Sequence, residues 1–130
     1  MIPIKTPEEI KIMREGGRVL AKIMEELKNK AKPGISTQEL DQLAEELVRH
    51  PPVGGADGAK PAFKGYLSLG ETGHGFPSAL CTSLNEEIVH AAPSKRQLKQ
   101  GDILSLDLGI LYKGFYSDMA ITMPIGKITP

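Results

Sequence analysis

The sequence predicts an α+β domain in which two amino-terminal helices pack on an antiparallel sheet. Apolar residues recur every three or four positions through the first 50 residues, as on the buried face of a helix. From residue 78 onward, short strand patterns alternate with turn signals. Helices followed by a run of strands are typical of the α+β class. A chain of 130 residues can build one hydrophobic core, so we expect a single domain over residues 1–130.

Composition and charge narrow the range of partners. Lysine plus arginine and aspartate plus glutamate both number 16, so the net charge is zero and no basic field indicates nucleic-acid binding. No apolar run approaches the length of a membrane span, and residues 1–3 lead into a charged helix rather than a signal sequence. The lone Cys81 excludes a disulfide framework. We therefore expect a cytoplasmic protein without nucleic-acid or membrane partners.

The first helix is predicted over Thr6–Lys30. Thr6 and Glu9 form a capping box, and a proline stands at the first helical position. Gly16 and Gly17 each cost about 1 kcal/mol relative to alanine in mid-helix, so we expect close contact with another element there, or a flexible kink. The predicted buried stripe consists of Ile10, Met13, Gly17, Leu20, Met24, Leu27 and Ala31.

The second helix opens with another capping box, Ser36 with Glu39, and ends at residues 49–52, where a histidine and two prolines follow Arg49. Its predicted buried stripe is Leu40, Leu43, Ala44, Leu47 and Val48. Residues 51–75 are rich in glycine and proline and lack periodicity, which predicts a long irregular loop. His74, between two glycines of this loop, is interpreted as a flexible surface histidine.

Strands are predicted over Ser78–Leu84 and Glu87–Ala91, with a turn at residues 85–86 between them. The last element is a hairpin over Gly101–Gly126. Two apolar runs flank Lys113 and Gly114, a pair that can accept positive φ, so Tyr112 is expected opposite Phe115. One face then collects Leu104, Leu106, Leu108, Ile110, Ser117, Met119 and Ile121, and the other collects Ser105, Asp107, Gly109, Asp118, Ala120 and Thr122.

Two carboxylates share the polar face of this hairpin. Gly109 lies directly opposite Asp118, and Asp107 is its diagonal neighbour, at roughly 7–8 Å between backbones. Without compensation the two acids repel and raise each other's pKa, so the pair, with a glycine leaving room between them, suits a divalent cation. The alternative is that this is the solvated face of an amphipathic hairpin, with both acids in water.

Several segments together resemble the type I methionine aminopeptidases. They are FPSALCTSLNEEIVH at residues 76–90, GDILSLD at residues 101–107 and GFYSD at residues 114–118, with ten residues between the two aspartates. That family belongs to the pita-bread metallopeptidases, which also include aminopeptidase P and prolidase. Both helical segments and residues 58–63 fit the same family, so the resemblance covers almost the whole chain.

The resemblance implies roles for particular residues. Asp107 matches the bridging metal ligand, Asp118 matches the next ligand, and His90 matches the histidine that hydrogen-bonds the substrate amide or the developing intermediate. Carboxylates of this kind hold Mn, Fe, Co or Zn, two ions per complete site, and such ions activate water and polarise a peptide carbonyl. Without the two aspartates, His90 would be interpreted as an ordinary histidine at a strand end.

Four further residues, Phe63, Tyr66, Phe76 and Cys81, fall where the family builds the pocket for the first side chain of the substrate. Taken alone, each of the four would be interpreted as a plain core residue. The sequence departs from the family here, because residues 67–75 intervene where the family has a very short spacer. The longer spacer would affect the shape of the pocket, and the shape of the pocket determines specificity for methionine.

The family fold has two similar halves with the active site between them, and this sequence matches only the amino-terminal half. The remaining ligands of the family, one histidine and two glutamates, belong to the other half. His50 and His74 precede the hairpin and lack the matching context, so they do not replace those ligands. An isolated monomer is therefore expected to be a poor peptidase or none.

Three interpretations follow: a fragment of a complete enzyme, a half that forms a homodimer, or a half that serves only as a binding module. We favour the homodimer, because an uncovered half would expose apolar surface worth about 25 cal/mol per Å² when buried. The predicted activity is removal of the amino-terminal methionine from peptides or nascent chains. The alternative substrates are those of Xaa-Pro aminopeptidases.

Overall fold

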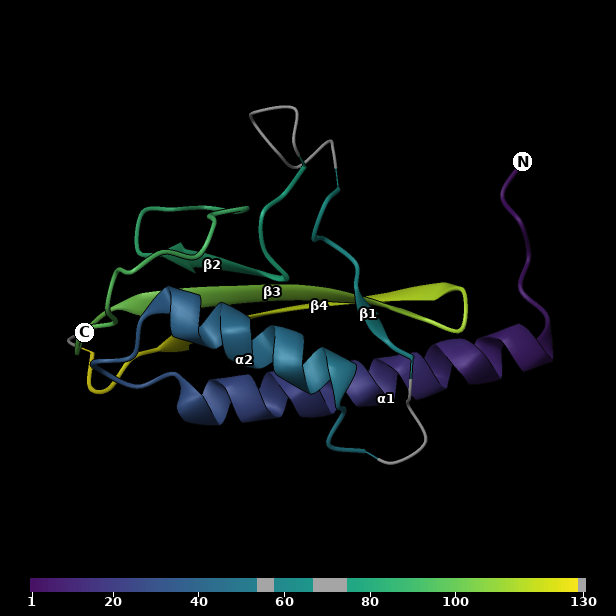
Figure 1. Cartoon of the computed structure of the whole chain (residues 1–130), viewed down its shortest axis with the longest axis horizontal. Coiled ribbons are helices and arrows are strands. Elements are labelled where there is room, and N and C mark those ends of the chain that lie inside the picture. Colours follow the sequence, from purple (N-terminus) through teal and green to yellow (C-terminus); the bar gives the residue numbers. More distant parts are fainter. Residues whose placement is uncertain (54–57, 67–74, 129–130) are drawn as a thin grey trace.

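A computed structural model describes residues 1–53, 58–66 and 75–128 (Figure 1). Two long helices lie side by side along one face of an antiparallel sheet, which confirms the predicted α+β class. The helices are α1 (Pro7–Lys30) and α2 (Thr37–Arg49), and the strands are β1 (Lys60–Pro61), β2 (Leu80–Leu84), β3 (Ile103–Tyr112) and β4 (Phe115–Pro124). In the part of the chain that the structure describes, neither helix is apolar enough over a sufficient length to cross a membrane.

Both helices begin with the predicted capping boxes. The Glu9 N–H donates to Thr6 Oγ1 at 3.2 Å, and the Thr6 N–H donates back to Glu9 Oε2 at 2.7 Å. Ser36 and Glu39 exchange the same two bonds at 3.2 and 2.8 Å. Such caps satisfy backbone donors that the helix cannot satisfy itself, and each is typically worth about 1 kcal/mol.

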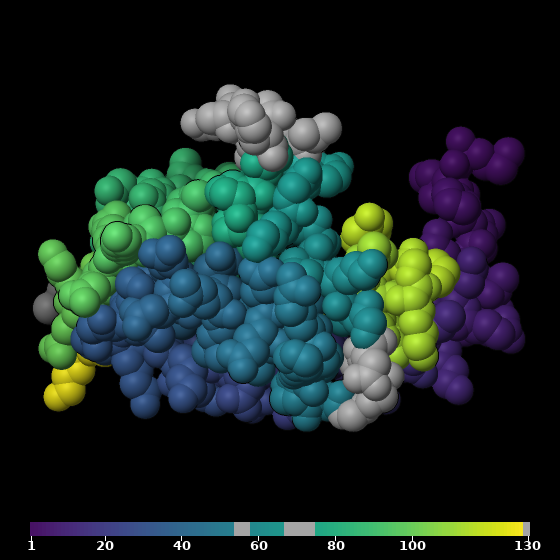
Figure 2. All heavy atoms as spheres, in the orientation of Figure 1, coloured from purple at the N-terminus to yellow at the C-terminus, as the bar shows by residue number. Residues whose placement is uncertain are grey.

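The buried stripe of α1 is shorter than the sequence predicts. Leu20, Met24 and Leu27 are buried as expected, but Ile10 is 46% exposed and Met13 36% exposed. Ile12, which lies between them in the sequence, packs against the core instead, and Gly16 is buried where Gly17 was predicted, so the buried face of α1 is turned relative to the predicted stripe. The amino-terminal end of α1 also extends past the tip of the β3–β4 hairpin (Figures 1 and 2). The prediction that they are buried was therefore wrong, because the spacing of apolar residues along a helix does not decide which of two overlapping faces meets the sheet.

The hairpin has the predicted register. Tyr112 pairs with Phe115, and the ladder continues without interruption to Ile103 opposite Pro124. Lys113 and Gly114 both have positive φ, 47° and 85°, as a two-residue type I′ turn requires. The even-numbered residues of β3 are buried beneath the helices, so the core and the polar face fall on the predicted sides.

β1 and β2 pair with the other edge of β3, at residues 110–111 and 104–108 respectively. β1 lies inside the segment 51–75 that the sequence predicts to be irregular, and the remaining described residues of that segment form no helix or strand. His74 lies outside the described residues. Residues 85–86 form the predicted turn, with Asn85 at φ 54°.

The predicted strand over Glu87–Ala91 was wrong. The Glu87 side chain turns back to accept a hydrogen bond from the Leu84 N–H at 2.8 Å, and His90 has a φ of 59°, which interrupts an extended path. One backbone bond, from the Thr82 N–H to the Ala91 oxygen at 2.9 Å, holds the segment beside β2. It is therefore an ordered connection rather than a strand.

A carboxylate ties α2 to the sheet. Asp41 Oδ1 accepts the N–H groups of Ala79 and Leu80, both at 2.9 Å, where the chain enters β2. Burial raises the pKa of Asp41, and these two bonds oppose the rise without cancelling it. These bonds hold the start of β2 next to α2, whose buried residues Leu40, Ala44 and Val48 belong to the core.

The two mid-helix glycines of α1 differ in their surroundings. A Cβ on Gly16 would lie 3.1 Å from Ser117 Oγ and 3.6 Å from Tyr112 Cβ, so this glycine permits the expected close contact with the hairpin. A Cβ on Gly17 would meet nothing within 4 Å. Only one of the pair is therefore explained by packing.

We predict that Gly17→Ala raises the free energy of unfolding by about 0.5–1 kcal/mol, because alanine gains helix propensity there without a clash. Gly16→Ala should give less stabilisation or none, because the Ser117 hydroxyl must move. Urea unfolding followed by circular dichroism measures both variants. Equal stabilisation by the two would show that the contact of Gly16 with the hairpin is unimportant.

Candidate functional site

The two predicted metal ligands lie on the face of the sheet that the helices leave open. Gly109 pairs with Asp118, and Asp107 pairs with Ala120, as predicted. The pKa of Asp107 is raised, first by burial, then by the negative charge of Asp118 and by a side-chain hydrogen bond with it. Oδ1 of Asp107 is buried and finds no hydrogen-bond partner among the described residues. The structure thus brings both carboxylates together and leaves one oxygen unsatisfied.

The space over Gly109 is filled rather than open. A Cβ at this position would lie 2.6 Å from Phe63 Cε1 and 3.2 Å from the Cβ of Ala62. The expectation that this glycine leaves room for an ion was therefore wrong. Its role is to let the ring of Phe63 approach the strand beside Asp118.

His90 lies near the carboxylate pair. Its charge lowers the pKa of Asp107, in opposition to the effect of Asp118. Its φ of 59° places it in the left-handed region, which histidine adopts more readily than most residues but which still costs free energy. Its side chain is exposed. A histidine held in a costly conformation beside two acids is a candidate for a functional role.

A cavity of about 340 Å³ opens next to Asp118. Phe63 and Tyr66, both predicted pocket residues, line it together with Gly109 and Tyr116. Tyr116 was not among the pocket residues predicted from the sequence. The alternation along β4 could have found it, because residues 116 and 118 fall on the same face of a strand.

The other two predicted pocket residues, Phe76 and Cys81, are buried in the interior of the protein. Phe76 is 3% exposed and Cys81 1% exposed, and neither lines the cavity. Cys81 is paired with Asp107 across the sheet. Burial, followed by the charge of Asp107, raises the pKa of the Cys81 thiol to about 12, so it is a neutral thiol near pH 7.

The ends of the unusual spacer are joined by hydrogen bonds. The Gly65 N–H donates to the Phe76 oxygen at 2.8 Å, and the Phe76 N–H donates to the Tyr66 oxygen at 3.1 Å. Of the spacer, residues 67–74 lie outside the described residues. These two bonds hold residues 65 and 66 beside Phe76, and Tyr66 lines the cavity next to Asp118 together with Phe63.

The carboxylate pair fits a divalent cation only in part. Both donors are carboxylates, which suit hard cations, and Asp107 offers a buried oxygen that lacks a donor. Within residues 1–53, 58–66 and 75–128, no three histidine, cysteine, aspartate or glutamate side chains are arranged to hold a metal ion. His50 is the exposed carboxyl-terminal cap of α2. A complete coordination sphere therefore needs donors from elsewhere.

The family model described as metallopeptidase family M24 matches residues 11–130. The chain belongs to this family. It is 48% identical over 129 residues to methionine aminopeptidase 1 of Bacillus subtilis, and this match covers 99% of the chain but 47% of the relative. The methionine aminopeptidase of Helicobacter pylori is 41% identical, with 46% of it covered. The chain therefore spans about half the length of these relatives.

Solved structures agree with this assignment. The methionine aminopeptidase of Thermotoga maritima matches with a TM-score of 0.85 and 37% identity, over 99% of the chain and 47% of that structure. Aminopeptidase P of Escherichia coli matches more distantly, with a TM-score of 0.69, 26% identity, and 96% and 24% coverage. The predicted relation to one half of the pita-bread fold is confirmed.

We predict that the metal-free chain becomes less stable as pH rises through the pKa of Asp107. The folded chain holds this proton more tightly than the unfolded chain does, so the stabilisation is complete at low pH and is lost above the raised pKa. Asp107→Asn resembles the protonated form and should flatten the pH dependence. Urea unfolding at several pH values between about 4 and 7, with a chelator present, measures this effect. Glu46→Gln, at an exposed position of α2, should leave the profile of the wild type unchanged.

Proposed function

We propose that the chain provides the amino-terminal half of a methionine aminopeptidase active site. Asp107 and Asp118 would hold divalent metal, and His90 would act on the substrate. The observation that carries this proposal is the buried oxygen of Asp107, which has no hydrogen-bond partner among the described residues, beside Asp118, which lines an aromatic cavity. The relatives named methionine aminopeptidase, at 41–48% identity, support the same activity.

The cavity suits the first side chain of a peptide. Phe63, Tyr66 and Tyr116 present apolar ring surface to it, and aromatic rings make favourable contacts with a thioether sulfur. Asp118 stands at the same cavity, so the amino terminus of a bound peptide would lie beside the carboxylates. Phe76 and Cys81 would support the pocket from behind rather than contact the substrate.

His90 would donate a hydrogen bond to the substrate carbonyl oxygen as negative charge develops there. A bound divalent ion would supply Lewis acidity toward that carbonyl and lower the pKa of water. The chain itself contributes two carboxylates, an imidazole and the walls of a pocket. These residues bind and orient the peptide end.

The missing donors would come from a second subunit. One chain supplies two carboxylate ligands, and a homodimer would supply four carboxylates and two copies of His90 around one axis. A closed twofold dimer is the commonest assembly of soluble oligomers. The proposed active form is accordingly a homodimer with a metal site of altered composition.

A second candidate activity is that of an Xaa-Pro aminopeptidase. The structural match to aminopeptidase P, at a TM-score of 0.69 and 26% identity, supports this activity as an alternative. The two activities require different pockets. An apolar cavity takes a long flexible side chain, whereas Xaa-Pro cleavage depends on recognising proline at the second position.

Metal binding is tested apart from catalysis. We predict that Mn²⁺ or Co²⁺ raises the melting temperature of the wild type, because an ion that binds only the folded chain stabilises it. Asp107→Asn and Asp118→Asn should lose this shift, and Glu46→Gln should keep it. An equal shift in all four proteins would assign the effect to metal binding elsewhere.

Catalysis is tested with short peptides. With added Mn²⁺ or Co²⁺, the wild type should release the first residue from Met-Ala-Ser faster than from Ala-Pro-Ser, and Asp107→Ala should abolish the release. Loss of a metal ligand typically reduces activity by more than about a hundredfold, well beyond second-sphere effects. Mass spectrometry of the products measures the rates. Asp107→Ala purified in the same way controls for peptidases of the expression host, and equal activity of this variant would refute the proposal.

A further inference from the structure

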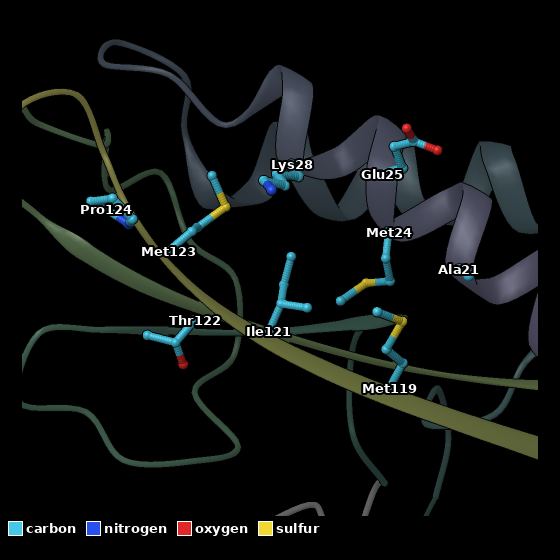
Figure 3. A pocket seen from close by; sticks show the side chains of 9 residues that line it. All are labelled: Ala21, Met24, Glu25, Lys28, Met119, Ile121, Thr122, Met123 and Pro124. Carbon is cyan, nitrogen blue, oxygen red and sulfur yellow. The ribbon is translucent and has the colours of Figure 1, made fainter.

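The two helices contact different parts of the sheet. α1 packs over β3 and β4, where Met24 points toward Met119 and Ile121 (Figure 3). α2 packs against β1 and β2. β1 leads into residues 62–66, and residues 75–79 lead into β2, so α2 is the helix that lies next to the two segments on either side of the spacer.

Asp41 of α2 holds the second of these segments. Its Oδ1 accepts the N–H groups of Ala79 and Leu80, both at 2.9 Å. A carboxylate accepts hydrogen bonds about twice as strongly as a neutral oxygen does. The two bonds lie immediately before Cys81, the residue of β2 that pairs with Asp107. Asp41 therefore fixes the point at which this segment enters the sheet.

Glu45 holds the first segment. It lies one helical turn after Asp41, on the same face of α2, and its Oε2 lies 2.7 Å from the Lys64 ammonium nitrogen. Its other oxygen pairs with Arg49 at 2.7 Å, within the helix. The Glu45 side chain is only 23% exposed, so solvent screens these pairs in part. Lys64 directly follows Phe63, which lines the cavity.

The two anchored segments form one connected structure. Burial raises the pKa of Asp41, the charge of Glu45 adds to the rise and that of Lys64 opposes it, so these three charges lie close together. On the side of the cavity, the Gly65 N–H donates to the Phe76 oxygen at 2.8 Å. The segments are thus attached to α2 and to each other.

We propose that Asp41 and Glu45 are positioning residues of the candidate site, which hold in place the wall of the cavity formed by Phe63 and Tyr66. This inference rests on the proposed function, which assigns the cavity to the first side chain of the peptide. Neither carboxylate is among the residues that line the cavity, so each acts through the segment that it binds. α2 then sets the shape of the pocket, while the β3–β4 hairpin supplies the metal ligands.

The reactivity of Cys81 tests the anchor at Asp41. Cys81 is the one cysteine of the sequence, is 1% exposed and directly follows Leu80, so its thiol reports local opening at the start of β2. Asp41→Ala should raise its rate of reaction with an aromatic disulfide reagent by at least about tenfold, because two hydrogen bonds to a carboxylate are lost. Asp41→Asn keeps an oxygen acceptor and should stay within about threefold of the wild type.

Val48→Ala controls for a general loss of stability. Val48 is buried at the other end of α2, and urea unfolding gives the unfolding constant of each variant. If the opening at Cys81 is local, Val48→Ala should react at about the rate of the wild type although its unfolding constant rises. Reaction of both alanine variants in proportion to their unfolding constants would overturn the anchor, and so would equal rates for Asp41→Asn and Asp41→Ala.

The α-protons of Gly109 report the position of the pocket wall. A Cβ on Gly109 would lie 2.6 Å from Phe63 Cε1, so these protons lie against an aromatic ring whose ring current shifts their NMR signals. Phe63→Leu removes the ring and provides the reference shift. Lys64→Gln should move the signals part of the way to that reference. Arg49→Gln, which removes the other partner of Glu45, should leave them unchanged, and equal shifts in these two variants would overturn the role of Glu45.

Peptide kinetics separate this inference from the proposed function. With added Mn²⁺, Asp41→Ala and Lys64→Gln should raise KM for Met-Ala-Ser several-fold and leave kcat nearly unchanged, because they loosen a binding wall and not the reacting groups. A fall in kcat at constant KM would overturn the positioning role. If even the wild type releases no methionine, the proposed function fails, whereas the Cys81 rates and the Gly109 shifts still decide whether α2 holds this wall.

Discussion

The two-residue turn at Lys113 and Gly114 sets the register on which the other features depend. Successive side chains of a strand point to opposite faces, so a slip of one residue would exchange every side chain of the hairpin between core and solvent. The observed register buries Leu104, Leu106, Leu108 and Ile110 under the helices and places Asp107 and Asp118 together on the open face. One local choice of turn geometry thus decides both the core and the site.

The free energies involved explain why this register is kept although it brings two acids together. Burying a leucine or isoleucine side chain is worth about 1.5–3 kcal/mol, and four of them on β3 are completely covered. Two like charges about 4 Å apart, as carboxylates within hydrogen-bond reach are, repel by about 4 kcal/mol at an effective dielectric constant of about 20. The hydrophobic contribution of β3 is larger, so the core can hold the carboxylates in an arrangement that they would not adopt alone. A proton or a cation then relieves the repulsion.

Features set by local sequence could be predicted, and those set by distant contacts could not. Both capping boxes and the hairpin register depend on residues a few positions apart, and the structure confirms them. The position of Phe63 over Gly109 depends on a chain crossing some 46 residues away in sequence (109 − 63), and no periodicity reports it. The exposure of Ile10 depends on which side of α1 meets the sheet, and the loss of the strand after Asn85 depends on the positive φ of His90.

Asp118 connects the chemistry of this half-fold to its assembly. Its side chain shares the open face with Asp107, and its backbone N–H and C=O point away from β3, because the oxygen of its partner Gly109 accepts from the Ala62 N–H on the far side of β3. A strand that pairs at this position must therefore place its own alternate side chains beside the two carboxylates, because side chains of neighbouring strands lie in register on the same face. Whatever chain covers this edge also supplies the next groups of the site. A strand that satisfies the backbone of β4 therefore also contributes side chains to the site on the open face, whichever part of the fold supplies that strand.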